Sequence, residues 1–195
     1  MSLKTKVIVG NITNLSDARY CAGMGVDLLS FPVGDSSNQI SLTTFLEISE
    51  WVAGPSYAIE MTNDVDQNLL QKVTELEVIE YVRVKAADLS FLTTLRNKKV
   101  IVDVNASEWG EQKDAILNMN PAFLVWHSSS AGFENAIEAN HLVPVLFSLN
   151  AAPNSFDDFT SWPMSGIALS GTAEDKPGQK DYEALADILE LLEAD

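Results

Sequence analysis

The feature that most constrains this chain is an alternation of strand-like and helix-like segments that repeats from one end to the other. Apolar runs of four to six residues, typical of buried strands, alternate with amphipathic segments, typical of helices. The first run is 6–10, the last is 166–169, and eight strand–helix pairs fit within 195 residues. Strands this apolar, each followed by a helix, predict a parallel sheet covered by helices.

The expected strands are 6–10, 27–31, 57–61, 79–84, 99–104, 122–126, 142–147 and 166–169. The expected helices run from the Asn14–Asp17 cap to Gly23 or Gly25, then over 41–52, 64–76, 88–95, 107–119, 132–139, weakly over 155–159, and over 182–192. Eight such pairs predict an α/β fold, a single (β/α)8 TIM barrel spanning residues 1–195. A doubly wound open sheet is the alternative, and eight pairs without a second domain favour the barrel.

Charge and cysteine content narrow the expected partners. The net charge is −16, so neither nucleic acid nor an anionic membrane surface is an expected partner. No apolar run reaches the ~18 residues of a membrane span, and the first residues do not form a signal peptide, so the cytoplasm is the expected location. With one cysteine, Cys21, and two histidines, we expect no disulfide framework, no metal site and no cofactor.

The stretch Ser170–Asp181 is the first candidate for function. It follows the last strand-like run, and in a barrel phosphate groups bind after strands seven and eight, at the carboxyl ends of the strands. A loop of small residues exposes backbone N–H groups that can hold an anion. We therefore expect a phosphorylated small molecule to bind at Ser170, Gly171, Thr172 and Ala173, although the same residues also suit an ordinary turn between strand and helix.

Three stretches resemble phosphoribosylanthranilate isomerase, the barrel enzyme of tryptophan biosynthesis. Lys6–Ala18 resembles its K-I-C-G-I-T-x-x-x-D-A, and Cys21–Phe31 resembles its A-x-x-x-G-A-D-x-x-G-F. Ser165–Asp181 resembles its final V-D-x-S-S-G-V-E-x-x-P-G-x-K-D. Length and element order agree as well, so the resemblance spans the chain, with its specific parts at the two ends.

The resemblance implies an Amadori rearrangement of a phosphorylated sugar. In that family a first-strand cysteine is the base and an aspartate ending the sixth strand is the acid. An arginine of the second loop holds the anthranilate carboxylate, and backbone N–H groups after strands seven and eight hold the phosphate. The resemblance also implies a homodimer.

Most positions that carry this chemistry differ here. The cysteine position falls on Val9, with Asn11 as an extra residue beside it, and the aspartate position falls on His127. The loop arginine falls on Asn38, and a fourth-strand histidine falls on Lys85. Together with Asn11, these two residues are expected to line the ligand mouth. General acid–base catalysis needs titratable groups beside the substrate, so we expect the family activity to be close to absent.

His127 remains a candidate acid or base, because histidine titrates near neutrality; it also fits a strand-end histidine bonded to a backbone carbonyl. Asp103 is a weaker catalytic candidate. Like Lys85 and Glu60, it points either to the barrel mouth or to the helices, because a one-residue slip reverses the two. Four tryptophans are expected to pack: Trp109, Trp126 and Trp162 inside the protein, and Trp51 between a helix and the barrel.

Together these observations predict a diverged relative of phosphoribosylanthranilate isomerase. It is expected to bind a phosphorylated small molecule, with lost or altered isomerase activity. Two alternatives stay open. One is a non-catalytic binding or regulatory protein, and the other is an active isomerase that uses a different base; a mouth blocked by Trp126 or Leu149 would favour the former.

Overall fold

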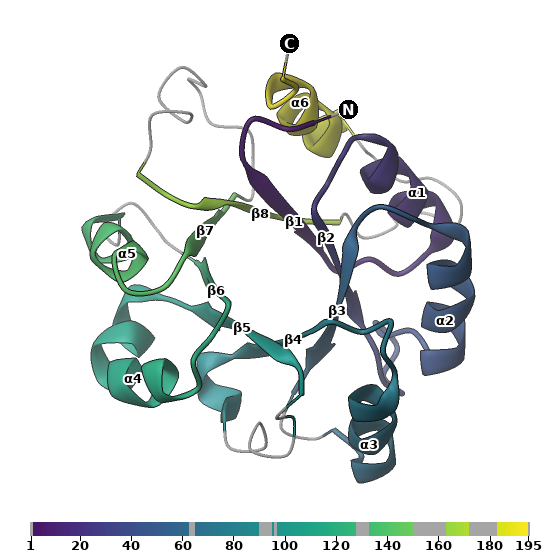
Figure 1. The fold of residues 1–195 in the computed structure, drawn as a ribbon, viewed down its shortest axis with the longest axis horizontal. Coiled ribbons are helices and arrows are strands. Elements are labelled where there is room, and N and C mark those ends of the chain that lie inside the picture. The colour runs from purple at the N-terminus through teal and green to yellow at the C-terminus, as the bar shows by residue number, and fades with distance from the viewer. Residues whose placement is uncertain are drawn as a thin grey trace.

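Eight parallel strands close into a barrel. The computed structural model describes residues 2–62, 65–89, 95, 97–127, 133–149, 163–171 and 183–194. Each strand is hydrogen-bonded to the next, and β8 returns to β1. Helices surround the ring of strands (Figure 1). The expected (β/α)8 barrel is therefore confirmed, and the open sheet is not formed.

The element bounds follow the predicted alternation closely. The strands are β1 Lys6–Gly10, β2 Leu28–Pro32, β3 Ser56–Met61, β4 Tyr81–Lys85, β5 Lys99–Val104, β6 Phe123–Trp126, β7 Val145–Ser148 and β8 Gly166–Ser170. The α-helices of the described residues are α1 Leu15–Gly23, α2 Leu42–Trp51, α3 Gln67–Glu75, α4 Ala106–Asn118, α5 Phe133–Asn140 and α6 Glu183–Leu191.

Two strands, β4 and β7, begin two or more residues later than the apolar pattern predicted. The run 142–147 starts as a strand only at Val145, because the N–H groups of Leu142 and Val143 both bond to the Ala139 carbonyl and close the end of α5. Ile79 likewise forms a turn with Leu76 before β4. Of the helix expected over 88–95, the described part shows a 3₁₀ turn over 86–89. The weak helix over 155–159 lies outside the described residues.

Side chains of the strands alternate between the barrel lumen and the surrounding helices. The lumen core is made of buried residues from seven strands, with Tyr81 of β4 packed against them: Ile8, Leu28, Ala58, Ile101, Val125, Leu146 and Ala168. The outer layer packs under the helices. There the ring of Phe31 meets those of Phe45 and Tyr57 at centroid distances of 5.1 and 5.9 Å.

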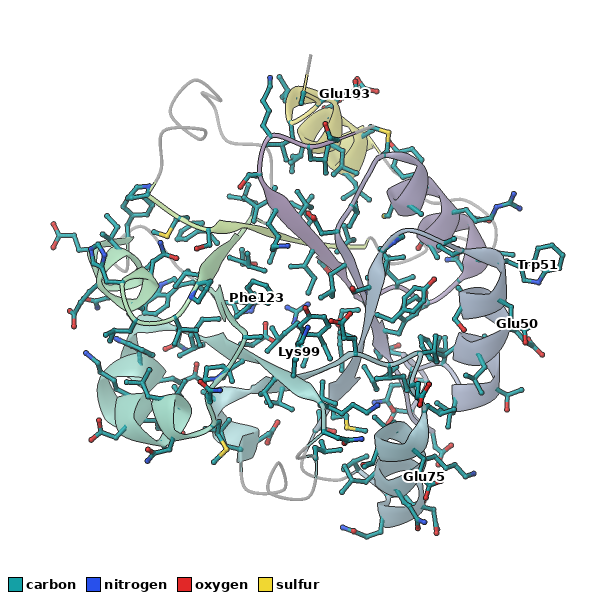
Figure 2. The ribbon with its side chains drawn as sticks, in the orientation of Figure 1. Glu50, Trp51, Glu75, Lys99, Phe123 and Glu193 are labelled. Carbon is teal, nitrogen blue, oxygen red and sulfur yellow. The ribbon has the colours of Figure 1, made fainter. Side chains whose placement is uncertain are left out.

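The tryptophans divide between the core and the surface. Trp109 and Trp126 are buried, as expected, and their ring centroids lie 6.1 Å apart. The prediction for Trp51 is wrong: it is 71% exposed and points away from the molecule (Figure 2). α2 uses Phe45 and Ile48 to contact the barrel, and Trp51 lies outside that face. Trp162 lies outside the described residues.

The ends of the chain and the amino end of the barrel are tied by short contacts. The Lys4 N–H bonds to the Leu192 carbonyl at 2.8 Å, so the N-terminal segment lies beside α6 (Figure 1). At the amino end of β5, Lys99 pairs with Glu80 at 2.5 Å. Figure 2 shows Lys99 and Phe123 within the ring of strands.

None of the helices that the structure describes is long and apolar enough to cross a bilayer.

Candidate functional site

Three charged side chains interrupt otherwise apolar strands at the carboxyl end of the barrel. Ala58, Tyr81 and Ile101 contribute to the lumen core. Because side chains alternate along a strand, the residues two places further on also face the lumen: Glu60, Arg83 and Asp103. The register places Glu60 directly opposite Arg83 on neighbouring strands. Sequence alone left the direction of Glu60 and Asp103 open, and the structure directs both to the mouth.

Arg83 holds this group of charges together. Its Nε donates to Asp103 Oδ2 at 2.7 Å and its Nη2 to Asp103 Oδ1 at 2.6 Å, which makes a bidentate pair. Its Nη1 lies 3.6 Å from Glu60 Oε1. Only 11% of the Arg83 side chain and 15% of the Asp103 side chain are exposed. Two-point pairing of this kind fixes both planar groups in one geometry.

The two partners keep each other ionised. Burial alone would raise the pKa of the Asp103 carboxyl, but Arg83 and the bond to His127 hold this pKa below its ordinary value. Burial alone would lower the pKa of the Arg83 guanidinium, but Asp103 and then Glu60 raise it above its ordinary value. The mouth therefore contains a fixed cation between two carboxylates.

His127 follows β6 and joins the same network. Its backbone N–H bonds to the Val104 carbonyl at 2.8 Å, and its Nε2 lies 2.5 Å from Asp103 Oδ1. The side chain is 46% exposed. The structure thus brings together the two residues predicted as catalytic candidates. With Nε2 at Asp103, Nδ1 is the ring nitrogen left to face a ligand, and it makes no hydrogen bond within the described residues.

The end of β1 presents a glycine to the lumen. Val9 is fully buried and belongs to the outer layer under the helices. Gly10 is the residue that faces inward: a Cβ there would collide with the Arg83 guanidinium and lie 3.0 Å from Glu60 Oε1. Asn11 follows with a positive φ of 56°, and its backbone N–H donates to Glu60 Oε1 at 2.8 Å. The side chain of Arg83 therefore occupies the space beside the end of β1.

The end of β8 is tied to the end of β1. The Gly171 N–H, expected to face a phosphate, instead donates to the Gly10 carbonyl at 2.8 Å, because Gly171 continues the pairing of β8 with β1. The Asn11 side chain donates to the Gly171 carbonyl at 3.4 Å. Ser170 is exposed beside them. Thr172 and Ala173 lie outside the described residues.

A pocket of about 520 Å³ opens over the ends of β3 to β6. The polar and charged side chains that line it are Gln39, Glu60, Thr62, Arg83, Lys85, Asp103, Asn105, Glu108 and His127. Asn38, expected at the mouth, is exposed in the loop before α2, and its neighbour Gln39 lines the pocket in its place. Neither Trp126 nor Leu149 lines this pocket, since both belong to the outer layer.

Arg83 is the site residue that the sequence analysis missed. In the sequence, Arg83 is a cation inside the apolar run of β4. Glu60 and Asp103 interrupt the neighbouring strands β3 and β5 in the same way. A cation flanked in this way by carboxylates on the two neighbouring strands predicts ion pairing if the register is known. No group of three or more histidine, cysteine or acidic side chains in the described ranges is arranged to hold a metal ion.

Comparison with known proteins places this barrel among solved structures. No protein-family model and no curated protein sequence matches the chain. The phosphoribosyl anthranilate isomerase of Thermus thermophilus superimposes with a TM-score of 0.73 and 16% identity, over 96% of this chain and 98% of that one. The present chain therefore has the fold of phosphoribosylanthranilate isomerase.

Two further solved barrels, one isomerase and one decarboxylase, also superimpose on the chain. One in complex with reduced 1-(o-carboxyphenylamino)-1-deoxyribulose 5-phosphate has a TM-score of 0.74 and 17% identity, over 96% of this chain and 98% of that one. Orotidine 5′-monophosphate decarboxylase from Methanocaldococcus jannaschii, with the inhibitor BMP, has a TM-score of 0.62 and 13% identity, over 99% of this chain and 100% of that one. The fold of this chain is therefore the isomerase fold that the sequence resemblance indicated.

Proposed function

We propose that this protein is a diverged, phosphoribosylanthranilate isomerase-like barrel that binds a phosphorylated small molecule and has lost or altered the isomerase reaction. Two barrels that share its fold support the choice of ligand. One was solved with a deoxyribulose 5-phosphate derivative, and the other is named for a 5′-monophosphate substrate. The sequence of Ser170–Asp181 supports a phosphate site in the corresponding loop.

The observation that carries the proposal is the replacement of a base by an arginine beside β1. The inward residue there is Gly10, and the space beside it holds the guanidinium of Arg83. Neither Val9 nor the amide of Asn11 can accept a proton near neutral pH. Cys21, the one cysteine of the sequence, is buried in α1. A base carried by the first strand itself, as the resemblance implies for the isomerases, therefore has no counterpart. The carboxylate beside the end of this strand, Glu60, accepts from the Asn11 N–H and lies against Arg83.

The acid of the reaction is changed as well. β6 is followed by His127 in place of the aspartate that the resemblance implies, and the ring is held by Asp103. A histidine in this place still transfers protons, so an altered reaction is part of the proposal. The Gly171 N–H is engaged with Gly10, and the Ser170 hydroxyl donates to the Gly171 carbonyl at 3.2 Å. For Thr172 and Ala173, which lie outside the described residues, phosphate binding is proposed from the sequence alone.

The ion-pair network favours one second candidate, a binding protein without catalysis. Arg83 pairs with both Asp103 and Glu60, and His127 keeps one ring nitrogen that no described residue uses. The two candidates differ in what happens to a bound ligand. A ligand recovered unchanged after long incubation with the protein supports the binding protein. Conversion that stops in His127→Gln supports the altered enzyme.

Calorimetric titration of the full chain with ribose 5-phosphate and with ribose tests the ligand class. The two compounds differ only in the phosphate group, so ribose is the matched control. We expect the phosphorylated sugar to bind and to raise the melting temperature, while ribose does neither. Equal responses to both sugars, or no response to either, would overturn the phosphate assignment. The homodimer implied by the resemblance stays a prediction.

A further inference from the structure

Two side chains of the mouth keep groups that the ion-pair network does not use: the ammonium of Lys85 and the Nδ1 of His127, whose Nε2 already meets Asp103. Lys85 ends β4 and pairs in register with Asp103 of β5, and His127 follows β6. Both line the same pocket, and Asp103 lies between them on the middle strand. The side chain of Lys85 is exposed, and it makes no hydrogen bond or ion pair with any described residue. An ammonium and a ring nitrogen therefore flank one carboxylate, open to the pocket.

The charge of the pocket depends on the protonation of His127. The groups that face it from the described elements are Glu60 of β3, Arg83 and Lys85 of β4, Asp103 of β5 and Glu108 of α4. These are three carboxylates and two cations, so the pocket carries one net negative charge while His127 is neutral. Protonation of His127 balances the charges. An incoming anion meets less repulsion when the histidine is charged.

The guanidinium of Arg83 is not open to an incoming anion, because its N–H groups face carboxylates. Its Nε and Nη2 are engaged with Asp103, and its Nη1 faces Glu60. The backbone N–H groups at the start of α4 are engaged as well, since those of Ser107 and Glu108 both bond to the Asn105 side chain. Lys85 and a protonated His127 are thus the cations of the pocket that an anion can reach.

We propose that Lys85 and His127 form a proton-linked anion site on the β4–β6 side of the mouth, suited to a dianion such as sulfate or a phosphate monoester. Lys85 binds the anion, and His127 takes up a proton as the anion enters. The site lies across the barrel from the end of β8. The inference rests on the proposed function because it assumes that the mouth receives small anionic molecules, and it adds a second anchoring point with its own pH dependence.

The sign of the pH dependence follows from linkage. A ligand that binds the protonated form more tightly loses affinity as the pH rises, by at most tenfold per pH unit for one proton. The affinity is therefore measured across the neutral range. Sulfate is a suitable probe because its own charge stays constant there. For the full chain we expect the affinity for sulfate to fall about tenfold between pH 5.5 and pH 7.5.

Variants separate the two side chains. His127→Gln, which keeps a donor for Asp103, should bind sulfate weakly and with no pH dependence, and His127→Asn is the second variant if the first does not fold. Lys85→Met should weaken binding at every pH. His141→Gln removes the other histidine of the sequence, and Lys99→Met removes a cation from the opposite end of the barrel. Both controls should match the unmodified protein.

The outcomes distinguish this site from the proposed function. If sulfate does not bind, if its affinity does not change with pH, or if His127→Gln and Lys85→Met match the unmodified protein, the proton-linked site is overturned. The proposed function still stands in each of these cases if ribose 5-phosphate binds and ribose does not. Its failure would show in that separate titration.

Discussion

Among the individual residues of the mouth, Arg83 has the most extensive influence. It pairs with Asp103 and with Glu60, and its guanidinium occupies the space beside Gly10. The small size of Gly10 and the position of Arg83 depend on each other, because a side chain at Gly10 would displace a group that two carboxylates hold. This dependence gives the first prediction.

Gly10→Ala should destabilise the protein by about 1–3 kcal/mol, because the new methyl group forces the Arg83 guanidinium away from its partners. Gly23→Ala is the matched control: Gly23 is the last residue of α1, and a Cβ there meets nothing within 4 Å. Urea unfolding measures both free energies. A Gly10→Ala variant as stable as Gly23→Ala would show that Arg83 moves aside without cost.

Arg83→Met should cost about 3 kcal/mol or more, because it leaves the carboxylate of Asp103 nearly buried and without its cation. Adding Asp103→Asn removes that charge. The double variant Arg83→Met, Asp103→Asn should therefore lose less than the two single variants added together, by about 1 kcal/mol or more. Strict additivity in urea unfolding would contradict the coupling between the two side chains.

The depressed pKa of Asp103 predicts how this coupling responds to pH. A carboxyl whose folded pKa lies below its unfolded value of about 3.9 stabilises the protein above that value, and this contribution is lost as the pH falls through the folded pKa. The stability difference between the unmodified protein and Asp103→Asn should thus be full at pH 6 and shrink below pH ~4. A difference that stays constant down to pH 2 would contradict the assignment.

Among the elements, α4 is fixed beside the mouth by Asn105, the residue that caps its start. Asn105 accepts hydrogen bonds from the N–H groups of Ser107 and Glu108, and the Glu108 side chain accepts from the Asn105 N–H at 2.9 Å. This reciprocal cap ends β5 and starts the helix within two residues of Asp103. It also places the carboxylate of Glu108 in the wall of the pocket.

Asn105→Ala should lower the free energy of unfolding by about 0.5–2 kcal/mol, because two N–H groups lose their acceptor. Asn118→Ala makes the same chemical change at the other end of α4, where the residue is exposed, and should have little effect. Thermal and urea unfolding compare the two. Equal losses in both variants would mean that the cap does not hold this helix.

The sequence pattern predicted the elements better than the contacts between them. Apolar runs located every strand to within a few residues, because burial on both sides of a parallel strand requires such runs. The pairing of Arg83 with Asp103 was not predicted, since it depends on the register between β4 and β5. The bond from Gly171 to Gly10 depends in the same way on the closure of β8 onto β1. Long-range register has no local signal in the chain.

For the whole molecule, eight repeated pairs were enough to predict the barrel, and the barrel rule then located the site. Active sites of this fold lie at the carboxyl ends of the strands, so His127, Asp103 and Lys85 were named as candidates from the sequence, while the direction of Asp103 and Lys85 stayed open until the register was known. The prediction failed where a polar residue lay in a loop, as for Asn38, because loop conformation decides which neighbour faces the pocket.

We propose that this barrel shares the isomerase fold and lacks the isomerase acid–base pair. An activity assay tests this proposal: the purified full chain is given phosphoribosylanthranilate, and its rate of conversion is compared with that of a phosphoribosylanthranilate isomerase at equal concentration. An acid and a base each contribute about 10²–10⁴-fold, so we predict a rate at least about 10⁴-fold below that of the isomerase. A rate within about tenfold of the isomerase would contradict the claim.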